Sequence, residues 1–360
     1  MLLSSPLPLP DALARHGRAA GIARTLELTL PAQQTPWRPS GLRVEAGQHY
    51  SVFASGRIDW SRRLPGLYGG PRFHLWARVS PGGRIVNLRR DTDSFIADCA
   101  GELEFGIYMG MWKNAFGELA SDPAIYARLT GELTLQVVLW QHSALAGLRA
   151  LAAAAPAVPA FAAELAHLEH PAPPPAGWDY LVEAGQAEMY RPTLTPDGAP
   201  AIHLCGADDQ GILVREVDFP LSPTTRLDWR WRVDTHPSTV AEDTPYTHDY
   251  LSVAAEFEDG RDLTWIWSSS LPVGHHFACP IKAWSARETH WVARSGTQDF
   301  GRWVSESRAV HADVAVAIGK PPARIVRIWL IVVATFQHGR FDAQVADICL
   351  RDGERRLSVL

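Results

Sequence analysis

Residues able to move a proton are prominent in the second half of the chain. His248, Asp249 and Glu306 are the catalytic candidates there, because an imidazole or a carboxyl group can act as general acid or base. A glycosidase needs two carboxyl groups about 5 Å or about 7–9 Å apart across the sugar, and the sequence does not fix that distance. The motifs GxSxG, GxGxxG and CxxC and the phosphate-binding P-loop are absent from the sequence, which argues against the enzyme classes that use them.

Tryptophan is the residue type best suited to holding a ligand. Nine of the 14 Trp residues follow residue 177, and three of these lie in a polar surround: Trp265, Trp267 and Trp303. Exposed rings on one sheet face would stack on the C–H groups of a sugar or on another planar apolar ligand. Arg294 would then hold a hydroxyl or carboxylate group. Burial of the three rings in the core is the alternative, and the sequence leaves both open.

Metal ligands are sparse in the sequence. Asp347, in the last expected long strand, resembles the acid that many carbohydrate-binding jelly rolls use for a structural calcium, so Ca²⁺ is the metal we expect there. Neither HxH nor HExxH spacing occurs, and a zinc or iron site would have to assemble in space. The four cysteines are far apart and favour buried thiols over a disulfide framework. They are Cys99, Cys205, Cys279 and Cys349.

The composition limits the classes of protein. The chain has 360 residues, 46% of them hydrophobic and 20% charged, which excludes disorder and allows about two domains. A net charge of −5 without a basic block argues against a nucleic-acid partner. With 28 Gly and 27 Pro, many short elements are expected rather than a helical bundle. Residues 1–23 lack the pattern of a signal peptide, and no stretch is apolar enough to span a bilayer. We therefore expect a cytoplasmic protein with no membrane partner.

The elements that must position these residues are mainly β-strands. After an extension over residues 1–23, residues 24–140 contain short alternating segments between Gly- and Pro-rich turns, a pattern typical of an antiparallel sandwich. Residues 141–177 form an Ala/Pro-rich linker, with two short helices and then a stiff proline spacer. Residues 178–360 return to β character and predict a second sandwich of jelly-roll type.

One strand of the second sandwich has a strict alternation. In residues 227–233, LDWRWRV, Trp229 and Trp231 fall on one face with Val233, and Arg230 and Arg232 fall on the other. Because side chains of a strand alternate between its two faces, we expect the two indoles in the core and the two guanidinium groups in water. Residues 309–318 are the one segment of this half expected to be partly helical.

The N-terminal half resembles the bacterial galactophilic lectin A family. Residues 44–56, VEAGQHYSVFASG, look like the opening of that family, and residues 101–105, GELEF, are similar to its next-to-last strand. The resemblance implies a β-sandwich that binds galactosides through a calcium ion held by an Asn-Asp pair just after this strand. Ile107 and Tyr108 stand at those positions here. We expect Tyr108, Trp112 and Asn114 to line a pocket for a sugar-like ligand.

The C-terminal half resembles a bacterial family of unknown function with a predicted jelly-roll fold. Four segments carry the resemblance: residues 227–233, residues 265–267 (WIW), residues 301–308 (GRWVSESR) and residues 343–348 (AQVADI). This resemblance implies a fold but no activity.

The sequence therefore predicts an all-β protein with two antiparallel β-sandwich or jelly-roll domains, joined by a short Ala-rich helical linker. Its first functional hypothesis is binding of a carbohydrate or a similar hydroxylated small molecule by these modules. The alternative is an enzyme on a carbohydrate-module-like scaffold, a cyclase, isomerase or lyase of a natural product or glycan. That enzyme would use an aromatic pocket and a carboxyl or His proton-transfer group. A third hypothesis is an assembly protein or homo-oligomer in which the Trp-rich face docks another subunit.

Overall fold

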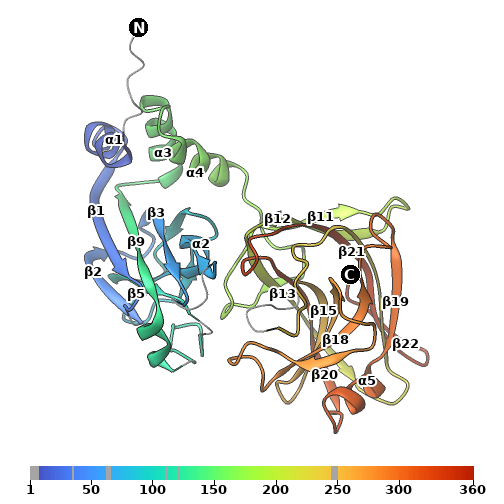
Figure 1. The fold of residues 1–360 in the computed structure, drawn as a ribbon. Coiled ribbons are helices and arrows are strands. Elements are labelled where there is room, and N and C mark those ends of the chain that lie inside the picture. Colours follow the sequence, from blue (N-terminus) through green and yellow to red (C-terminus); the bar gives the residue numbers. More distant parts are fainter. Residues whose placement is uncertain (1–7, 35, 62–65, 110–111, 121, 245–249) are drawn as a thin grey trace. The chain divides into compact units, whose positions relative to one another are not determined.

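The computed structural model describes residues 8–34, 36–61, 66–109, 112–120, 122–244 and 250–360. The chain divides into two compact units, Met1–Pro171 and Ala172–Leu360 (Figure 1). Both are built mainly from antiparallel sheets, which confirms the predicted all-β fold class. No helix in the described part of the chain has both the length and the apolar character needed to cross a membrane.

The first unit contains two sheets of antiparallel strands. One has the order β1-β9-β3-β4 with β7 beside β3, and the other has the order β2-β8-β5-β6. The strands of the first sheet are β1 (Ile22–Pro31), β9 (Thr130–Trp140), β3 (His49–Asp59), β4 (Tyr68–Gly69) and β7 (Thr92–Ile96). Those of the second are β2 (Trp37–Val44), β8 (Gly101–Ile107), β5 (Leu75–Ser80) and β6 (Val86–Asn87). The short helix α2 (Pro71–His74) precedes β5, and the 3₁₀ helix η1 (Pro123–Arg128) precedes β9.

Three α-helices of the first unit share one apolar cluster at the end of β9. They are α1 (Leu9–His16), α3 (Ala144–Ala154) and α4 (Pro159–Glu169), and α3 and α4 lie side by side (Figure 1). Trp140 packs among them with Leu148 and Phe161. A Cβ on Gly147 of α3 would lie 2.1 Å from the Trp140 ring, so this close approach needs glycine. The Ala-rich segment is thus packed onto the first unit, and residues 171–175 beyond it lie outside any helix or strand.

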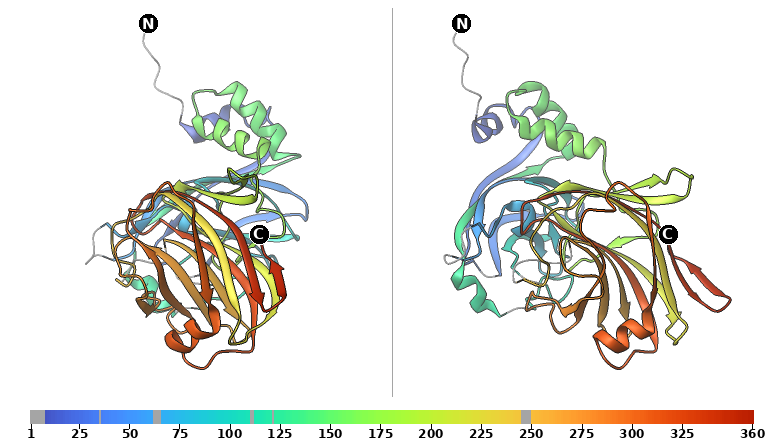
Figure 2. Two further views of the ribbon diagram at one scale, coloured as in Figure 1. Left: turned by 90° about the vertical axis from the view of Figure 1, so that its right-hand side faces the viewer. Right: turned by 45° about the vertical axis from the view of Figure 1, so that its right-hand side comes forward.

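The second unit contains a seven-stranded and a six-stranded sheet (Figure 2). The first comprises, in spatial order, β10 (Asp179–Tyr180), β13 (Gln210–Pro220), β20 (Arg324–Val333), β15 (Leu251–Phe257), β16 (Asp262–Ser268), β18 (Glu288–Ser295) and β17 (His276–Ala278). The second comprises β11 (Tyr190–Leu194), β12 (Pro200–Ala207), β21 (Arg340–Asp352), β14 (Arg226–Thr235) and β19 (Val304–Ala309), with β22 (Arg355–Ser358) beside β21. Among the described strands, β16 and β18 form the one parallel pair. The expected helix near residues 309–318 is α5 (Val310–Ala317).

Tryptophan rings fill the core between these two sheets. On β14, Trp229 and Trp231 are buried as their alternation predicts, and their rings meet edge to face with centroids 5.4 Å apart. Trp265 and Trp267 of β16 meet them from the facing sheet at 6.1 and 5.4 Å. Each buried indole removes roughly 200 Å² from water, which stabilises the fold by on the order of 5 kcal/mol before conformational entropy is counted.

Strands β15 and β16 are buried on both faces. The inner face carries the apolar core, and the opposite face carries polar groups that include Glu256, Asp262 and Thr264. The segment between β17 and β18 lies over this second face, because Arg287 contacts Trp284 of that segment and Trp329 of β20 at 5.2 and 5.4 Å from its guanidinium. Residues 251–257, LSVAAEF, alternate between these two faces, with Ser252 and Glu256 on the second face, although both faces are buried.

Candidate binding pocket

An open pocket of about 530 Å³ lies in the first unit between the start of β2, strand β5 and the segment that follows β8. Its walls combine apolar rings, charged groups and an amide. The lining residues are Pro36, Trp37, Arg78, Asn114, Phe116, Gly117, Glu118 and Leu119. Phe116 is 52% exposed, and among the described residues it is the one aromatic side chain in the set of exposed large hydrophobics.

A tight turn presents Phe116 to solvent. The turn is closed by a bridge between Trp112 and Leu119, and the amide of Gly117 donates to the Asn114 carbonyl at 3.2 Å. The Asn114 side chain stabilises the same turn, since its Oδ1 accepts from the Phe116 amide at 3.0 Å. Gly117 has a φ of +76°, and a Cβ at that position would lie 2.4 Å from the Trp37 ring. Glycine is therefore required for the turn to approach Trp37.

A layered stack forms the back of the pocket. The Arg78 guanidinium lies 4.5 Å from the Trp37 ring centroid, and Trp37 stacks on Trp112 with centroids 5.0 Å apart and planes 19° from parallel. Trp37 Nε1 donates to the Gly117 carbonyl at 2.9 Å. Arg78 Nη1 donates to the Phe116 carbonyl at 2.7 Å. These contacts tie the turn to the sheet and limit rearrangement of the pocket wall.

The charges around the pocket are paired. Arg78 Nε donates to Glu104 Oε2 at 2.8 Å, and Lys113 Nζ lies 2.5 Å from Glu118 Oε1. The Lys113 hydrogen bond is the largest factor that holds the pKa of Glu118 below its ordinary value. Asn114 Nδ2 also donates to Glu118 Oε2 at 3.1 Å. The pocket thus offers both donors and acceptors with little net charge.

Of the first-unit residues predicted from the sequence, Asn114 lines the pocket. Trp112 and Tyr108 are buried behind it, where Tyr108 stacks on Trp76 with centroids 5.4 Å apart. These two residues therefore support the wall. The sequence analysis did not identify Trp37, Arg78 and Phe116 as pocket residues. The signal in the sequence that could have identified the site is the turn from Asn114 to Gly117, which carries the apolar Phe116.

Trp265 and Trp267 lie in the core of the second unit, the alternative to a ligand face that the sequence left open. Both are fully buried. Trp265 Nε1 donates to Asp313 Oδ2 at 2.9 Å, and Trp267 Nε1 donates to the Gly296 carbonyl at 3.0 Å. Their rings contact the interior of the sandwich and present no surface on which a ligand could stack.

Arg294 and Glu306 form one hydrogen-bonded group in the second unit. Arg294 Nε donates to Glu306 Oε1 at 2.7 Å, and its Nη1 donates to Asp299 Oδ2 at 2.6 Å. Glu306 Oε1 also accepts from Trp231 Nε1 at 3.2 Å. A proton-transfer role for Glu306 would require this group to open. The other two catalytic candidates, His248 and Asp249, lie outside the described residues.

Trp303 and Asp347 are connected through Arg230 on the six-stranded sheet. Trp303 is half-buried, with the Arg230 guanidinium 5.6 Å from its ring centroid. Arg230 Nε donates to the exposed carboxylate of Asp347, which sits at a bulge with a φ of +55°. A calcium ion at Asp347 would have to displace this guanidinium.

Two buried groups of potential metal ligands occur among the described residues. Asp93, Glu164 and His167 form one in the first unit, where Arg89 Nη2 already pairs with Asp93 Oδ1 at 2.6 Å. Cys279, Glu288 and His290 form the other in the second unit. The second group combines sulfur, oxygen and nitrogen donors and is the stronger candidate for a metal site.

One family model matches part of the chain. Residues 177–349 match the model of a family described as a protein of unknown function, DUF3047, over the region whose motifs resemble a jelly-roll family. No curated protein matches the chain.

Two solved structures show a distant likeness to the chain. The N-terminal domain of EclA, a PllA-like lectin, has 15% identity and a TM-score of 0.25, over 31% of this chain and 94% of that one. The xyloglucanase domain of NopAA, a type three effector from Sinorhizobium fredii in complex with cellobiose, has 8% identity and a TM-score of 0.29, over 45% of this chain and 86% of that one. At these values neither likeness carries an argument about function.

Proposed function

We propose that the first unit binds a carbohydrate, or a similar hydroxylated small molecule, in the pocket beside Phe116. The observation that carries the proposal is the exposed Phe116 ring on a pocket of about 530 Å³ that also holds Asn114 and Glu118. An aromatic ring stacks on the C–H face of a sugar, while amide and carboxylate groups bond its hydroxyls. The volume suits one or two sugar rings.

The charges favour a neutral ligand. Arg78 is engaged by Glu104, and Lys113 is engaged by Glu118, so neither cation is left to attract a phosphate or a carboxylate. A phosphorylated ligand would need an unpaired guanidinium or ammonium in the pocket. A ligand whose polar groups are hydroxyls fits this balance better.

Glycan-array binding followed by isothermal titration with the full chain tests the proposal. We expect the wild-type protein to bind a subset of neutral glycans, with and without added Ca²⁺. Phe116→Ala should weaken that binding by roughly tenfold, which corresponds to about 1.4 kcal/mol, because the stacking surface is lost.

Ile96→Ala is the matched control. Ile96 is 62% exposed at the end of β7 in the same unit and does not line the pocket, so its truncation should leave glycan affinity unchanged. If the wild-type protein binds no glycan of the array, either with or without added Ca²⁺, the proposal is contradicted. Equal affinity of Phe116→Ala and the wild type would contradict the assignment of the pocket.

A further inference from the structure

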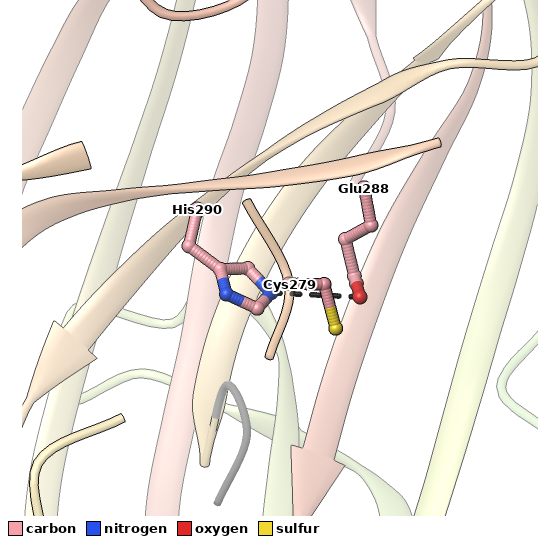
Figure 3. A group of neighbouring side chains, drawn as sticks. All are labelled: Cys279, Glu288 and His290. Carbon is pink, nitrogen blue, oxygen red and sulfur yellow. Dashed lines mark ion pairs between the residues drawn. The ribbon is translucent and has the colours of Figure 1, made fainter. Parts of the chain in front are cut away.

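Three side chains with different donor atoms converge under the segment that covers the seven-stranded sheet. Figure 3 shows the Cys279 sulfur, the Glu288 carboxylate and the His290 imidazole gathered in one place. All three residues are buried. Their donor atoms lie within 4.8 Å of one another, and His290 Nε2 is 3.5 Å from Glu288 Oε2. This site belongs to the second unit and is independent of the proposed carbohydrate pocket.

Strand register explains why these residues meet. Glu288 and His290 are two positions apart on β18, so both point to the same face of the sheet. Cys279 directly follows β17, which pairs antiparallel with β18, and its amide donates to the Glu288 carbonyl at 3.0 Å. On the other side of β18, the parallel partner of Glu288 is Asp262 of β16. Three potential ligands therefore meet at one point on the sheet, and Asp262 is the residue paired with Glu288 on the neighbouring strand.

The charges of the buried face also favour a cation. Three buried carboxyl groups, Glu256, Asp262 and Glu288, share this face with the guanidinium groups of Arg287 and Arg327. Arg287 makes its closest contact with Glu256 at 3.5 Å, and Arg327 lies 2.6 Å from Glu216 and 3.1 Å from Glu256. Arg287 Nε remains 3.9 Å from Asp262 Oδ2. Buried carboxylates are costly unless a positive charge compensates them, and a divalent ion would do so.

We propose that Cys279, Glu288 and His290 bind a zinc ion, with Asp262 as the fourth ligand. Thiolate, imidazole and carboxylate are the donors that zinc prefers, at about 2.3 Å for sulfur and about 2.0–2.2 Å for nitrogen and oxygen. A tetrahedral site with these bond lengths places its donor atoms roughly 3.3–3.8 Å apart. The donor atoms of Cys279, Glu288 and His290 lie up to 4.8 Å apart, so zinc binding requires them to approach one another by about 1 Å. Rotation about the side-chain torsions can supply this movement. Binding releases the Cys279 thiol proton to solvent.

The burial of the donors assigns the ion a structural role. Four protein ligands would leave no open coordination position, which is the arrangement of structural rather than catalytic zinc. The ion would fasten the segment between β17 and β18 to the sheet through Cys279. Metal removal should therefore loosen this segment first and leave the first unit unchanged.

The test uses the full chain and Co²⁺ as a spectroscopic probe. The protein is purified without chelators and its metal content is measured, and a second sample is refolded from urea with Co²⁺. We expect about one zinc per chain and, for cobalt, a thiolate charge-transfer band in the near ultraviolet with intense tetrahedral bands in the visible. The variants Cys279→Ser and His290→Asn should each lower cobalt affinity at least tenfold, and Cys279→Ser should abolish the charge-transfer band.

Cys349→Ser is the matched control, because Cys349 is a buried free cysteine of the same unit on β21. It should retain the band and the affinity. The proposal is overturned if the folded wild-type protein contains no metal and refolds in Co²⁺ without a thiolate band. It is also overturned if Cys279→Ser keeps the band of the wild type. The wild-type spectrum decides the question even where a variant fails to fold.

Discussion

Trp60 and His74 are joined by a buried hydrogen bond of 2.7 Å, in which the Trp60 indole Nε1 donates to His74 Nε2. The other ring nitrogen, His74 Nδ1, lies 2.7 Å from the Tyr108 carbonyl and donates to it. A neutral imidazole satisfies both contacts, whereas an imidazolium has no lone pair for the indole. Burial is the main cause that lowers the pKa of His74 to about 4. Protonation of His74 would break its hydrogen bond from Trp60, so the structure beside Tyr108 in the pocket wall depends on pH.

Acid should destabilise the first unit through His74. The folded pKa is below the unfolded value of 6.5, so the contribution is complete above pH 6.5 and is lost as the pH falls through about 4. The full loss is on the order of 3 kcal/mol. Urea unfolding at pH 7.5, 5.5 and 4.5 measures it. Because Glu164 acts in the opposite direction over the same pH range, the quantity to compare is the difference in unfolding free energy between the wild type and His74→Gln, which should fall as the pH is lowered from 7.5 to 4.5. The same change at exposed His142 should leave the pH dependence as in the wild type.

Alkaline conditions should destabilise the first unit through Glu164 of α4. This carboxyl is buried against β7, where Thr92 Oγ1 donates to its Oε2 at 2.8 Å, and burial raises its pKa to about 7. An acid whose folded pKa is raised stabilises the fold fully below its unfolded pKa of 4.5, and that contribution is lost as the pH rises through about 7.

Glu164→Gln should therefore stabilise the protein at pH 8, by up to on the order of 3 kcal/mol, and have little effect near pH 4. Glutamine keeps an acceptor for Thr92 and never ionises. Thermal unfolding across this pH range is the measurement. Glu169→Gln, at the more exposed end of the same helix, should change stability by less than about 0.5 kcal/mol at either pH. A variant that is less stable than the wild type at pH 8 would refute the assignment.

Two tryptophans of the second core permit a matched comparison. Trp265 Nε1 donates to Asp313, which also accepts from Arg308 Nε at 2.8 Å. Trp229 Nε1 is equally buried and has no hydrogen-bond partner among the described residues. Trp229→Phe removes ring volume alone, whereas Trp265→Phe also removes a donor from a buried carboxylate. We expect Trp265→Phe to cost about 1–2 kcal/mol more in unfolding free energy. Equal losses in denaturant titrations would show that the hydrogen bond contributes nothing.

Local patterns in the sequence predict several strands well. The alternation in residues 227–233 identifies β14 and its buried face, and the run at residues 251–257 coincides with β15. The pattern of residues 302–304 also predicts a strand, but β19 starts at Val304 and continues to Ala309, so the predicted bounds are wrong. Turn residues around it obscure the period. The sequence analysis did not identify β13, which lies next to the short edge strand β10, because polar and apolar residues mix along its bulged end.

The candidate sites depend on pairings that are not local. Trp37 and Gly117 are 80 positions apart and meet because β2 pairs with β8. The spacing of Glu288 and His290 indicates one shared face, but Cys279 joins them only through the β17–β18 pairing. The alternation along β16 does not decide whether Trp265 faces the core or a ligand, because both faces of the strand are buried. Sequence patterns therefore identify which residues share a face of a strand, but they do not determine which strands are neighbours in a sheet.

The pairing of Ile22 with Trp140 has an evolutionary consequence. Strand β1 begins where its neighbour β9 ends, at the same end of the first sheet, so the chain enters and leaves this sandwich at neighbouring points. A module with adjacent ends can be inserted into a host protein, duplicated or circularly permuted without breaking its internal strand pairing. The neighbouring ends of β1 and β9 therefore predict that the first unit tolerates such rearrangements.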